Sequence, residues 1–245
     1  MKLILLAAGK SSRIYNKIGI NKCLINVNDK SLIENIIDGA IANNIKEIEV
    51  VTGFKKNNIV KKLSKYKNIK FLENKKYNST DMVYSAMLAI KNSKTDLIIS
   101  YTDIFYQVSL FKLMNRISKN QISIPFTKDW RRIWNLRKKN IYNDAETFYK
   151  DKKNHLLEIG NKITKKNIRK IHGQFLGIIF LPRKKIKSVQ NLYRKNQNKK
   201  IQFTQFINQM IKANFLIKCI NYKDFWYEID DIKDLKNFRK IKNLF

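Results

Sequence analysis

The chain has 245 residues, 44% of them hydrophobic, which is enough for one α/β domain with a buried core. Its formal net charge is +32, from 51 Lys and Arg against 19 Asp and Glu. The basic residues are spread along the chain, and no zinc finger, basic zipper or aromatic RNP-type run accompanies them. Charge alone specifies no site, so we favour a solvated basic surface and keep a basic nucleic-acid-binding protein as an alternative.

The cysteine content and the hydropathy of the sequence indicate where in the cell the protein is expected. Cys23 and Cys219 form neither a metal-binding spacing nor a disulfide framework, and they fit a reducing compartment. The apolar N-terminal run is too short to span a bilayer and lacks a signal-peptide cleavage region. We therefore expect a cytoplasmic protein without a membrane partner. The sequence does not give the oligomeric state, and a homo-oligomer is compatible with it.

The first half of the chain alternates predicted strands and helices. Short apolar runs predict strands over residues 2–8, 47–54, 69–74 and 96–103. Helical patterns cover residues 31–44, 55–66 and 81–92. Ser31 and Glu34 form a capping box at the start of the first helix. We expect Ser79 or Thr80 to cap the helix at 81–92.

The second half is less regular. Residues 127–172 show little periodicity and predict a small inserted lobe. Strand character returns over 173–182 and 215–222, and helices are expected over 203–214 and 231–245. The alternation predicts one α/β domain over residues 1–245, with a Rossmann-like, mostly parallel sheet sandwiched by helices. Ligands of such sheets bind beyond the carboxyl ends of the strands.

The first predicted strand ends in a small, cationic loop, "LLAAGKSSR", at residues 5–13. This loop has neither the Walker pattern nor G-x-G-x-x-G. Its backbone N–H groups, the Ser11 and Ser12 hydroxyls and the Arg13 guanidinium suit a di- or triphosphate. Lys22, just before the next apolar run, can reach back to the same phosphates.

Residues 6–13 together with Lys22 resemble the signature of the nucleotidyltransferases that activate sugar phosphates and phosphocholine. "SYTDIFY" resembles that family's metal-binding Asp, and "WYEIDDIKDL" resembles its second Asp. The resemblance implies that Asp103 and Asp230 hold Mg²⁺. Two departures stand out: Asn21 replaces a customary Pro before the lysine, and Ser11 replaces a common Gly.

Within this superfamily, "NSTDMVYSAMLA", "LEIGNKI" and "HGQFLGIIFL" look most similar to the cytidylyltransferases for phosphocholine and phosphonates. The resemblance implies Mg²⁺-dependent transfer of CMP from CTP to a small phosphorylated acceptor, with release of pyrophosphate. Phosphocholine, a phosphonate and a phosphorylated amino acid such as phosphoglutamine are all compatible acceptors. The product would serve surface glycan decoration, as in capsular polysaccharide. A sugar-1-phosphate nucleotidyltransferase using UTP or dTTP is the near alternative.

The resemblance also implies roles for single residues. Lys22 would stabilise charge on the α-phosphate, and Arg13 would hold the leaving pyrophosphate. The implied nucleotide-binding residues are Leu6, Ala7, Ala8, Gly9, Lys10, Ser11, Ser12, Gly53, Ser79, Thr80 and Ser85. Asp81 stands where relatives often carry Asn, and its role stays open.

The acceptor pocket is expected in the inserted lobe. Trp130 and Trp134 lie near Asp129, Asp144 and Glu146 in the sequence, and aromatic faces and carboxylates both attract cations. We expect an acceptor with an amine or quaternary ammonium group. The expected acceptor-binding residues are Trp130, Trp134, Asp129, Glu146 and Gln174. Alternatively, the tryptophans are core residues and the acids pair with Arg131, Arg132 or Arg137.

Overall fold

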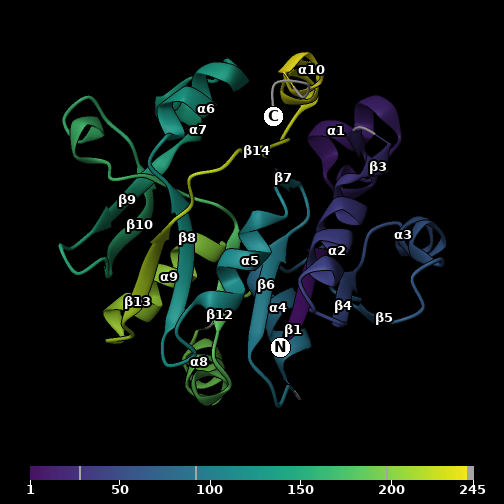
Figure 1. Ribbon diagram of the computed structural model, residues 1–245, viewed down its shortest axis with the longest axis horizontal. Coiled ribbons are helices and arrows are strands. Elements are labelled where there is room, and N and C mark those ends of the chain that lie inside the picture. Colours follow the sequence, from purple (N-terminus) through teal and green to yellow (C-terminus); the bar gives the residue numbers. More distant parts are fainter. Residues whose placement is uncertain (28, 92, 197, 242–245) are drawn as a thin grey trace.

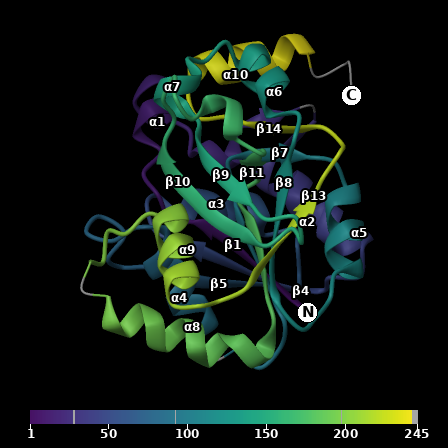
Figure 2. The ribbon, with the colours of Figure 1, turned by 90° about the vertical axis from the view of Figure 1, so that its left-hand side faces the viewer.

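A single large sheet crosses the molecule between two layers of helices (Figures 1 and 2). The computed structural model describes residues 1–27, 29–91, 93–196 and 198–241. The strands of this sheet are β1 (Lys2–Ala7), β4 (Glu47–Thr52), β5 (Ile69–Glu73), β6 (Leu97–Tyr101), β8 (Ile122–Thr127), β11 (Gln174–Phe175), β12 (Ile178–Leu181) and β13 (Ile217–Asn221).

Strand directions confirm a mostly parallel sheet. β1 pairs in parallel with β4 and β6, β4 with β5, and β8 with β13. β12 runs antiparallel to both β6 and β8, and β11 runs antiparallel to β8. The predicted strand at 173–182 is thus split into β11 and β12 by Gly177, which has a φ of +72°. A side chain there would collide with Ile104 and Tyr101.

Helices cover both faces of the sheet. In Figure 2, α4 (Met82–Ile90), α8 (Arg183–Lys195) and α9 (Phe203–Lys212) lie on one side, and α2 (Leu32–Ala42) and α5 (Ser109–Arg116) lie on the other. Burial on both faces explains why β1 reads as a continuous apolar run. The remaining helices are α1 (Ser12–Ile18), η1 (Lys22–Leu24), α3 (Lys56–Leu63), α6 (Trp130–Arg137), α7 (Ile141–Asp144), η2 (Ile168–Lys170) and α10 (Ile232–Ile241).

Three short antiparallel pairs complete the fold. β2 (Asn26–Val27) pairs with β3 (Lys30–Ser31), and β9 (Glu146–Lys150) with β10 (Leu156–Lys162). β7 (Ile104–Tyr106) pairs with β14 (Trp226–Glu228), which brings the C-terminal segment back to the end of β6. The irregular region 127–172 holds α6, α7, the short η2 and a hairpin, none of which the sequence predicted. That it is an inserted lobe of a single domain stays a prediction.

Two helix starts test the capping predictions. The Ser31–Glu34 capping box of α2 is confirmed, with both reciprocal hydrogen bonds present. The predicted cap of α4 is wrong, because Asp81 occupies the N-cap and its carboxyl accepts the Met82 N–H at 2.7 Å. Asp is as good an N-cap residue as Ser. Residue 92 and residues 242–245, at the ends of two predicted helices, lie outside the described residues.

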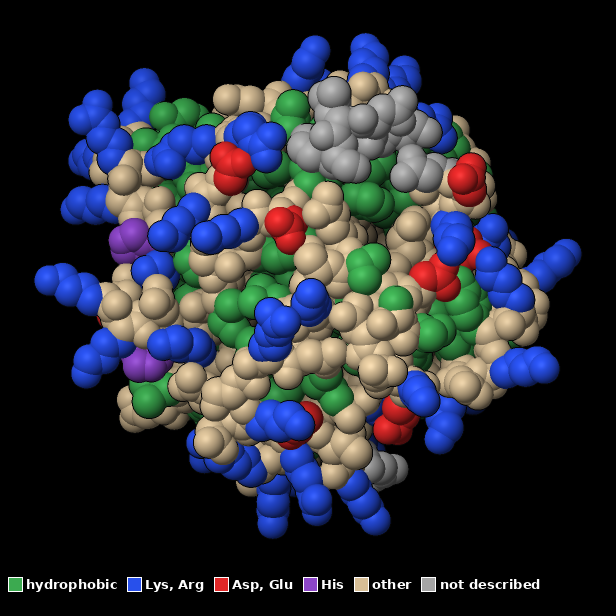
Figure 3. Space-filling model, viewed as in Figure 1, with side chains coloured by type: hydrophobic (Ala, Val, Ile, Leu, Met, Phe, Trp, Pro, Cys, Tyr) green, Lys and Arg blue, Asp and Glu red, His purple; other side chains and the backbone are tan. Residues whose placement is uncertain are grey.

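The surface and core agree with the composition. Lys and Arg side chains are spread over the face shown in Figure 3 and form no single patch there. Cys23 and Cys219 are both free and buried, as expected for core residues. Among the described residues, no helix is long and apolar enough to cross a bilayer.

Glu34 provides a test of the cap of α2 and of its contact with Lys62 and Lys65. Burial alone would raise the pKa of Glu34, but Lys65, Ser31 and Lys62 outweigh it and hold the pKa at about 2. Because this value is lower than in the unfolded chain, the stabilisation is present above about pH 4.5 and is lost as the pH falls toward 2. We expect Glu34→Gln to lower the free energy of unfolding at pH 7 by about 1–2 kcal/mol.

The measurement is urea unfolding of both proteins between pH 7 and pH 3. The difference between them should shrink as the pH falls. A difference that stayed constant over this range would show that the Glu34 charge does not stabilise α2.

Candidate active site

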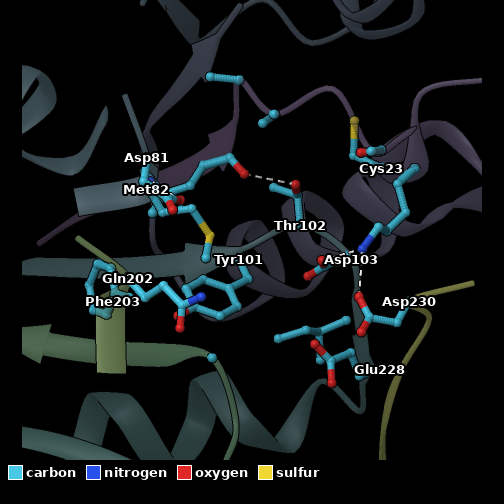
Figure 4. Close-up of a pocket in the computed structure, with 18 of the residues that line it drawn as sticks. Cys23, Asp81, Met82, Tyr101, Thr102, Asp103, Gln202, Phe203, Glu228 and Asp230 are labelled. Atoms are coloured by element: carbon cyan, nitrogen blue, oxygen red, sulfur yellow. Dashed lines mark hydrogen bonds and ion pairs between the residues drawn. The ribbon is translucent and has the colours of Figure 1, made fainter. Parts of the chain in front are cut away.

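A cavity of about 550 Å³ opens where β1, β5 and β6 end. It lies at the carboxyl edge of these parallel strands, where the topology predicts a ligand site. Figure 4 shows Asp103, Glu228 and Asp230 gathered at one end of the cavity and Asp81, Met82, Gln202 and Phe203 at the other. The cavity is therefore acidic at one end and mixed polar and aromatic at the other.

The loop after β1 forms one wall of this cavity. The residues of the loop that line it are Leu6, Ala7, Ala8, Gly9, Ser11, Ser12 and Arg13. Lys10 is exposed and does not line the cavity. A side chain added at Gly9 would meet open space, so the backbone there is accessible to a ligand. Ser11 has a φ of 52°, a left-handed conformation that turns the loop into α1.

A second polar wall faces this loop. Thr80 and Ser85 line the cavity, and both accept hydrogen bonds from the buried Asn74 amide, at 3.1 and 3.0 Å. Ser79 and Gly53 do not line it. Gly53 instead packs under the loop after β1, since a Cβ there would approach the Ala8 carbonyl oxygen to 2.7 Å. Its role is to let β4 approach the loop closely.

The acidic end of the cavity joins residues that are far apart in the sequence. Asp103 follows β6, and Asp230 lies two residues beyond β14, whose pairing with β7 brings the two together. The Lys22 ammonium lies 2.9 Å from Asp103 Oδ2 and 2.9 Å from Asp230 Oδ1. The predicted catalytic lysine and the two predicted metal ligands are thus in direct contact.

Charge pairing fixes the protonation states at this end. Burial would lower the pKa of Lys22, but the charges of Asp103 and Asp230 outweigh it and raise the pKa above its usual value. Burial likewise works against the charged form of Asp230, yet Lys22 and Arg13 hold the pKa of this carboxyl at about 2. Arg13 contacts Asp230 at 3.2 Å while remaining mostly exposed to solvent. Lys22 and Asp230 are therefore charged at neutral pH.

Glu228 is a third acid at this end, and the sequence analysis did not single it out. Carboxyl oxygens of Asp103, Glu228 and Asp230 lie within 4.8 Å of one another. Burial, and next the Asp230 charge, raises the pKa of Glu228 to about 8. The available signal was its place two residues before Asp230 in "WYEID", because alternate residues of an extended segment share a face.

The chemistry of this cluster fits a hard divalent cation. All three residues offer oxygen ligands, which Mg²⁺ prefers. Asp103 Oδ1 is buried and has no hydrogen-bond partner among the described residues, so it has a free lone pair for a ligand. Asp103, Glu228 and Asp230 are therefore the residues that can hold a metal ion.

Arg137 supports the cluster from the core side. The sequence suggested it only as an alternative partner for the acids near Trp130, and it does pair with Asp144 at 3.1 Å. Its side chain is fully buried and donates to Asp234 through Nε and Nη2, both at 3.2 Å. Nη1 lies 3.3 Å from Glu228, and Nη2 lies 4.0 Å from Asp230. Asp231 points elsewhere, pairing with Lys139 at 2.7 Å. The structure thus separates the adjacent acids, with Asp230 in the cavity and Asp231 outside it.

The predicted acceptor residues divide into two groups. Trp134, Glu146 and Gln174 line the cavity, whereas Trp130 and Asp129 do not. Trp130 is fully buried and packs edge-to-face on Trp134, with ring centroids 6.1 Å apart. Asp129 is exposed and pairs with Arg132. For these two residues the structure fits the alternative of core packing and local charge pairing.

Residues outside the predicted lobe complete the acceptor side. These additional lining residues are Tyr101, Phe175, Gln202, Phe203 and Thr204. They come from the end of β6, from β11 and from the start of α9, so no local sequence pattern connects them. The Tyr101 ring contacts Phe203 and Phe175 edge-to-face, at centroid distances of 5.7 and 6.1 Å.

A cavity that combines a small-residue loop with a lysine and a cluster of acids defines a nucleotidyltransferase site on this fold. Residues 3–202 match the family model described as MobA-like NTP transferase domain, and the chain belongs to this family. The protein is therefore an enzyme of the nucleotidyltransferase class.

Particular relatives extend this finding. The chain is 30% identical over 253 residues to the CTP:phosphoglutamine cytidylyltransferase of Campylobacter jejuni, an alignment that spans 96% of this chain and 98% of that protein. The inositol-1-phosphate CTP transferase from T. maritima has the same fold, with a TM-score of 0.77, 18% identity and coverage of 98% and 96%. The CTP:phosphocholine cytidylyltransferase from Streptococcus pneumoniae gives 0.73 and 16%, with 98% of both chains covered.

The acid cluster yields a prediction on metal binding. We expect Asp103→Asn and Asp230→Asn each to abolish detectable binding of Mn²⁺, used as a paramagnetic probe, because each removes a charged oxygen ligand. Asp231→Asn is the matched control and should bind Mn²⁺ as the native protein does. Electron paramagnetic resonance of free Mn²⁺, with the nucleotide present, measures this, and thermal unfolding checks the fold.

Loss of Mn²⁺ binding in Asp231→Asn, together with native Mn²⁺ binding in Asp230→Asn, would reverse this assignment of the two adjacent acids. Unchanged Mn²⁺ binding in all three variants would show that the cluster is not a metal site.

Trp130 yields a prediction on stability. Because its ring is fully buried, Trp130→Ala should lower the free energy of unfolding by about 3–5 kcal/mol. The folded fraction of this variant should keep the same order of kcat/KM among acceptors as the native enzyme. Denaturant unfolding and steady-state kinetics measure the two effects. A variant with native stability but selectively reduced kcat/KM for one acceptor would show that Trp130 belongs to the acceptor pocket.

Proposed function

We propose that this enzyme transfers CMP from CTP to a small phosphorylated acceptor and releases pyrophosphate, with Mg²⁺ as cofactor. Phosphocholine, a phosphonate and a phosphorylated amino acid such as phosphoglutamine are the acceptors considered. The nucleotide choice is supported by the relative at 30% identity, which is named for CTP and phosphoglutamine. We further propose that the CDP-linked product serves surface glycan decoration, which rests on the sequence resemblance alone.

The observation that carries the proposal is the contact of Lys22 with Asp103 and Asp230 beside the loop after β1. The loop offers backbone groups, two hydroxyls and Arg13 to a triphosphate. The acids and the lysine lie in the same cavity as that loop. A nucleotide bound at the loop would therefore have its α-phosphate close to the lysine and to a metal ion held by the acids. The polar and aromatic end of the cavity, away from the acids, is then available to an acceptor.

The proposed reaction is a displacement at the α-phosphorus of the nucleotide. A phosphate or phosphonate oxygen of the acceptor forms the new P–O bond, the bond to the β-phosphate breaks, and pyrophosphate leaves with both electrons. The nucleophile is already ionised at neutral pH, so no general base is needed. This agrees with a chain of only two histidines, neither of which lines the cavity.

The side chains would act by positioning and by charge. Lys22 is charged and buried, so it can stabilise negative charge on the α-phosphate where water screens little. Arg13 is the exposed partner of Asp230 and can turn to the leaving pyrophosphate. Mg²⁺ held by Asp103, Glu228 and Asp230 would neutralise charge on the phosphate oxygens. Catalysis then depends on holding two anionic substrates together.

The test is a pyrophosphate-release assay with CTP, UTP, dTTP and GTP against a panel of phosphorylated acceptors. We expect CTP with one small acceptor to give the highest rate. Lys22→Ala should lower kcat by roughly 100-fold or more, with a smaller change in nucleotide affinity, because it removes one electrostatic stabiliser of the transition state. Lys17 is an exposed lysine on α1, and Lys17→Ala is the control, which should have the native kcat and KM.

Two outcomes would contradict this proposal. Highest turnover with UTP or dTTP and a hexose 1-phosphate would favour the sugar-activating alternative. A Lys22→Ala enzyme with native kcat and only a raised KM would make Lys22 a binding residue and not a catalytic one.

A further inference from the structure

Glu146, the first residue of β9, is an acid in the cavity wall with no ion pair among the described residues. This is unusual in a chain with 51 basic residues against 19 acidic ones. Burial raises the pKa of Glu146, and the Asp144 charge adds to this, so the carboxyl lacks a compensating positive charge. A half-buried acid without a cationic partner is a suitable receptor for a cationic ligand.

The surrounding structure holds Glu146 in place. The Gln174 side chain accepts a hydrogen bond from the Glu146 N–H at 3.3 Å and donates another to the Glu146 carbonyl oxygen. The Thr204 hydroxyl lies 3.5 Å from Glu146 Oε1, and it lines the same cavity. Gln174 therefore fixes the backbone, while the carboxyl and one hydroxyl face the ligand space together.

The other cation-binding groups that the sequence suggested are already engaged. Asp144 lies 3.1 Å from Arg137 and 3.5 Å from Lys139. The Trp134 ring stacks on Trp226 and also lies 5.0 Å from the Arg137 guanidinium carbon. With Asp129 outside the cavity, Glu146 is an acid on the acceptor side that has no cationic partner among the described residues. Asp81 also lines the cavity, and its carboxyl accepts the Met82 N–H as the N-cap of α4.

We propose that Glu146 binds a primary ammonium group of the acceptor and so determines acceptor specificity. This inference rests on the proposed function, because it places the acceptor beside Glu146. An ammonium N–H can donate a charge-assisted hydrogen bond to the carboxylate and another to the Thr204 oxygen. A quaternary ammonium has no N–H and cannot do so. The expected acceptor is therefore a phosphorylated compound that also carries a free primary ammonium group, such as a phosphorylated amino acid.

The experiment compares Glu146→Gln with the native enzyme on four acceptors. Phosphoglutamine and phosphoethanolamine carry a primary ammonium, phosphocholine carries a quaternary one, and ethyl phosphate carries none. Glu158→Gln, on the other strand of the same hairpin and outside the cavity lining, is the matched control. Thermal unfolding of both variants checks that the hairpin is intact.

We expect Glu146→Gln to lower kcat/KM for the primary amines by about 10- to 100-fold, mainly through KM, the usual effect of losing a hydrogen bond to a charged group. Ethyl phosphate should be used as poorly by the variant as by the native enzyme. Glu158→Gln should behave as native on all four acceptors.

Two kinetic results would overturn the inference. An equal loss on all four acceptors would make Glu146 a structural residue. A native preference for phosphocholine that survives in Glu146→Gln would place the cation elsewhere.

A binding measurement separates this inference from the proposed function. If the native enzyme turns over none of the acceptors with any nucleotide, the proposed function fails, and calorimetric titration with phosphoethanolamine still decides the role of Glu146. Binding that is present in the native protein and lost in Glu146→Gln supports the inference. Equal binding by both proteins, or none by the native one, overturns it.

Discussion

The crowding of Asp103, Glu228 and Asp230 into one corner of the cavity is the constraint on which the rest of the structure depends. Three acids within 4.8 Å repel one another, and burial makes each charge more costly. The protein balances them from two sides, with Lys22 at the cavity and Arg137 in the core. The pairing of β14 with β7 holds this arrangement, because it brings Glu228 and Asp230 to the end of β6.

Features encoded in consecutive residues were predictable from the sequence. The buried strands of the first half appear as apolar runs bounded by polar turns, and the first helix carries its own cap. The loop after β1, Lys22, Asp103 and Asp230 each belong to a short recognisable stretch, and the structure brings them into one cavity. Their roles in binding and catalysis stay predictions, because contact alone does not show chemistry.

Features that depend on long-range packing were not predictable. Whether Trp130 or Trp134 faces the cavity depends on how α6 lies against β14, which no local pattern encodes. Arg137 looks like any other basic residue among 51 until the fold surrounds it with acids. Glu146 and Thr204 meet although 58 residues separate them, so the sequence showed an acid in the lobe but not the surroundings that make it available.

The full burial of Arg137 has a consequence for how this protein can change over evolutionary time. Its guanidinium contacts Asp144, Asp234 and Glu228 and lies 4.0 Å from Asp230, so acids that line the cavity also surround a charge in the core. Removing one partner of a buried ion pair typically costs about 3–5 kcal/mol. In a descendant that no longer needed the reaction, loss of these acids would therefore still lower the stability of the fold. Retention of the acids in a distant homologue would be evidence of an intact core before it was evidence of an active enzyme.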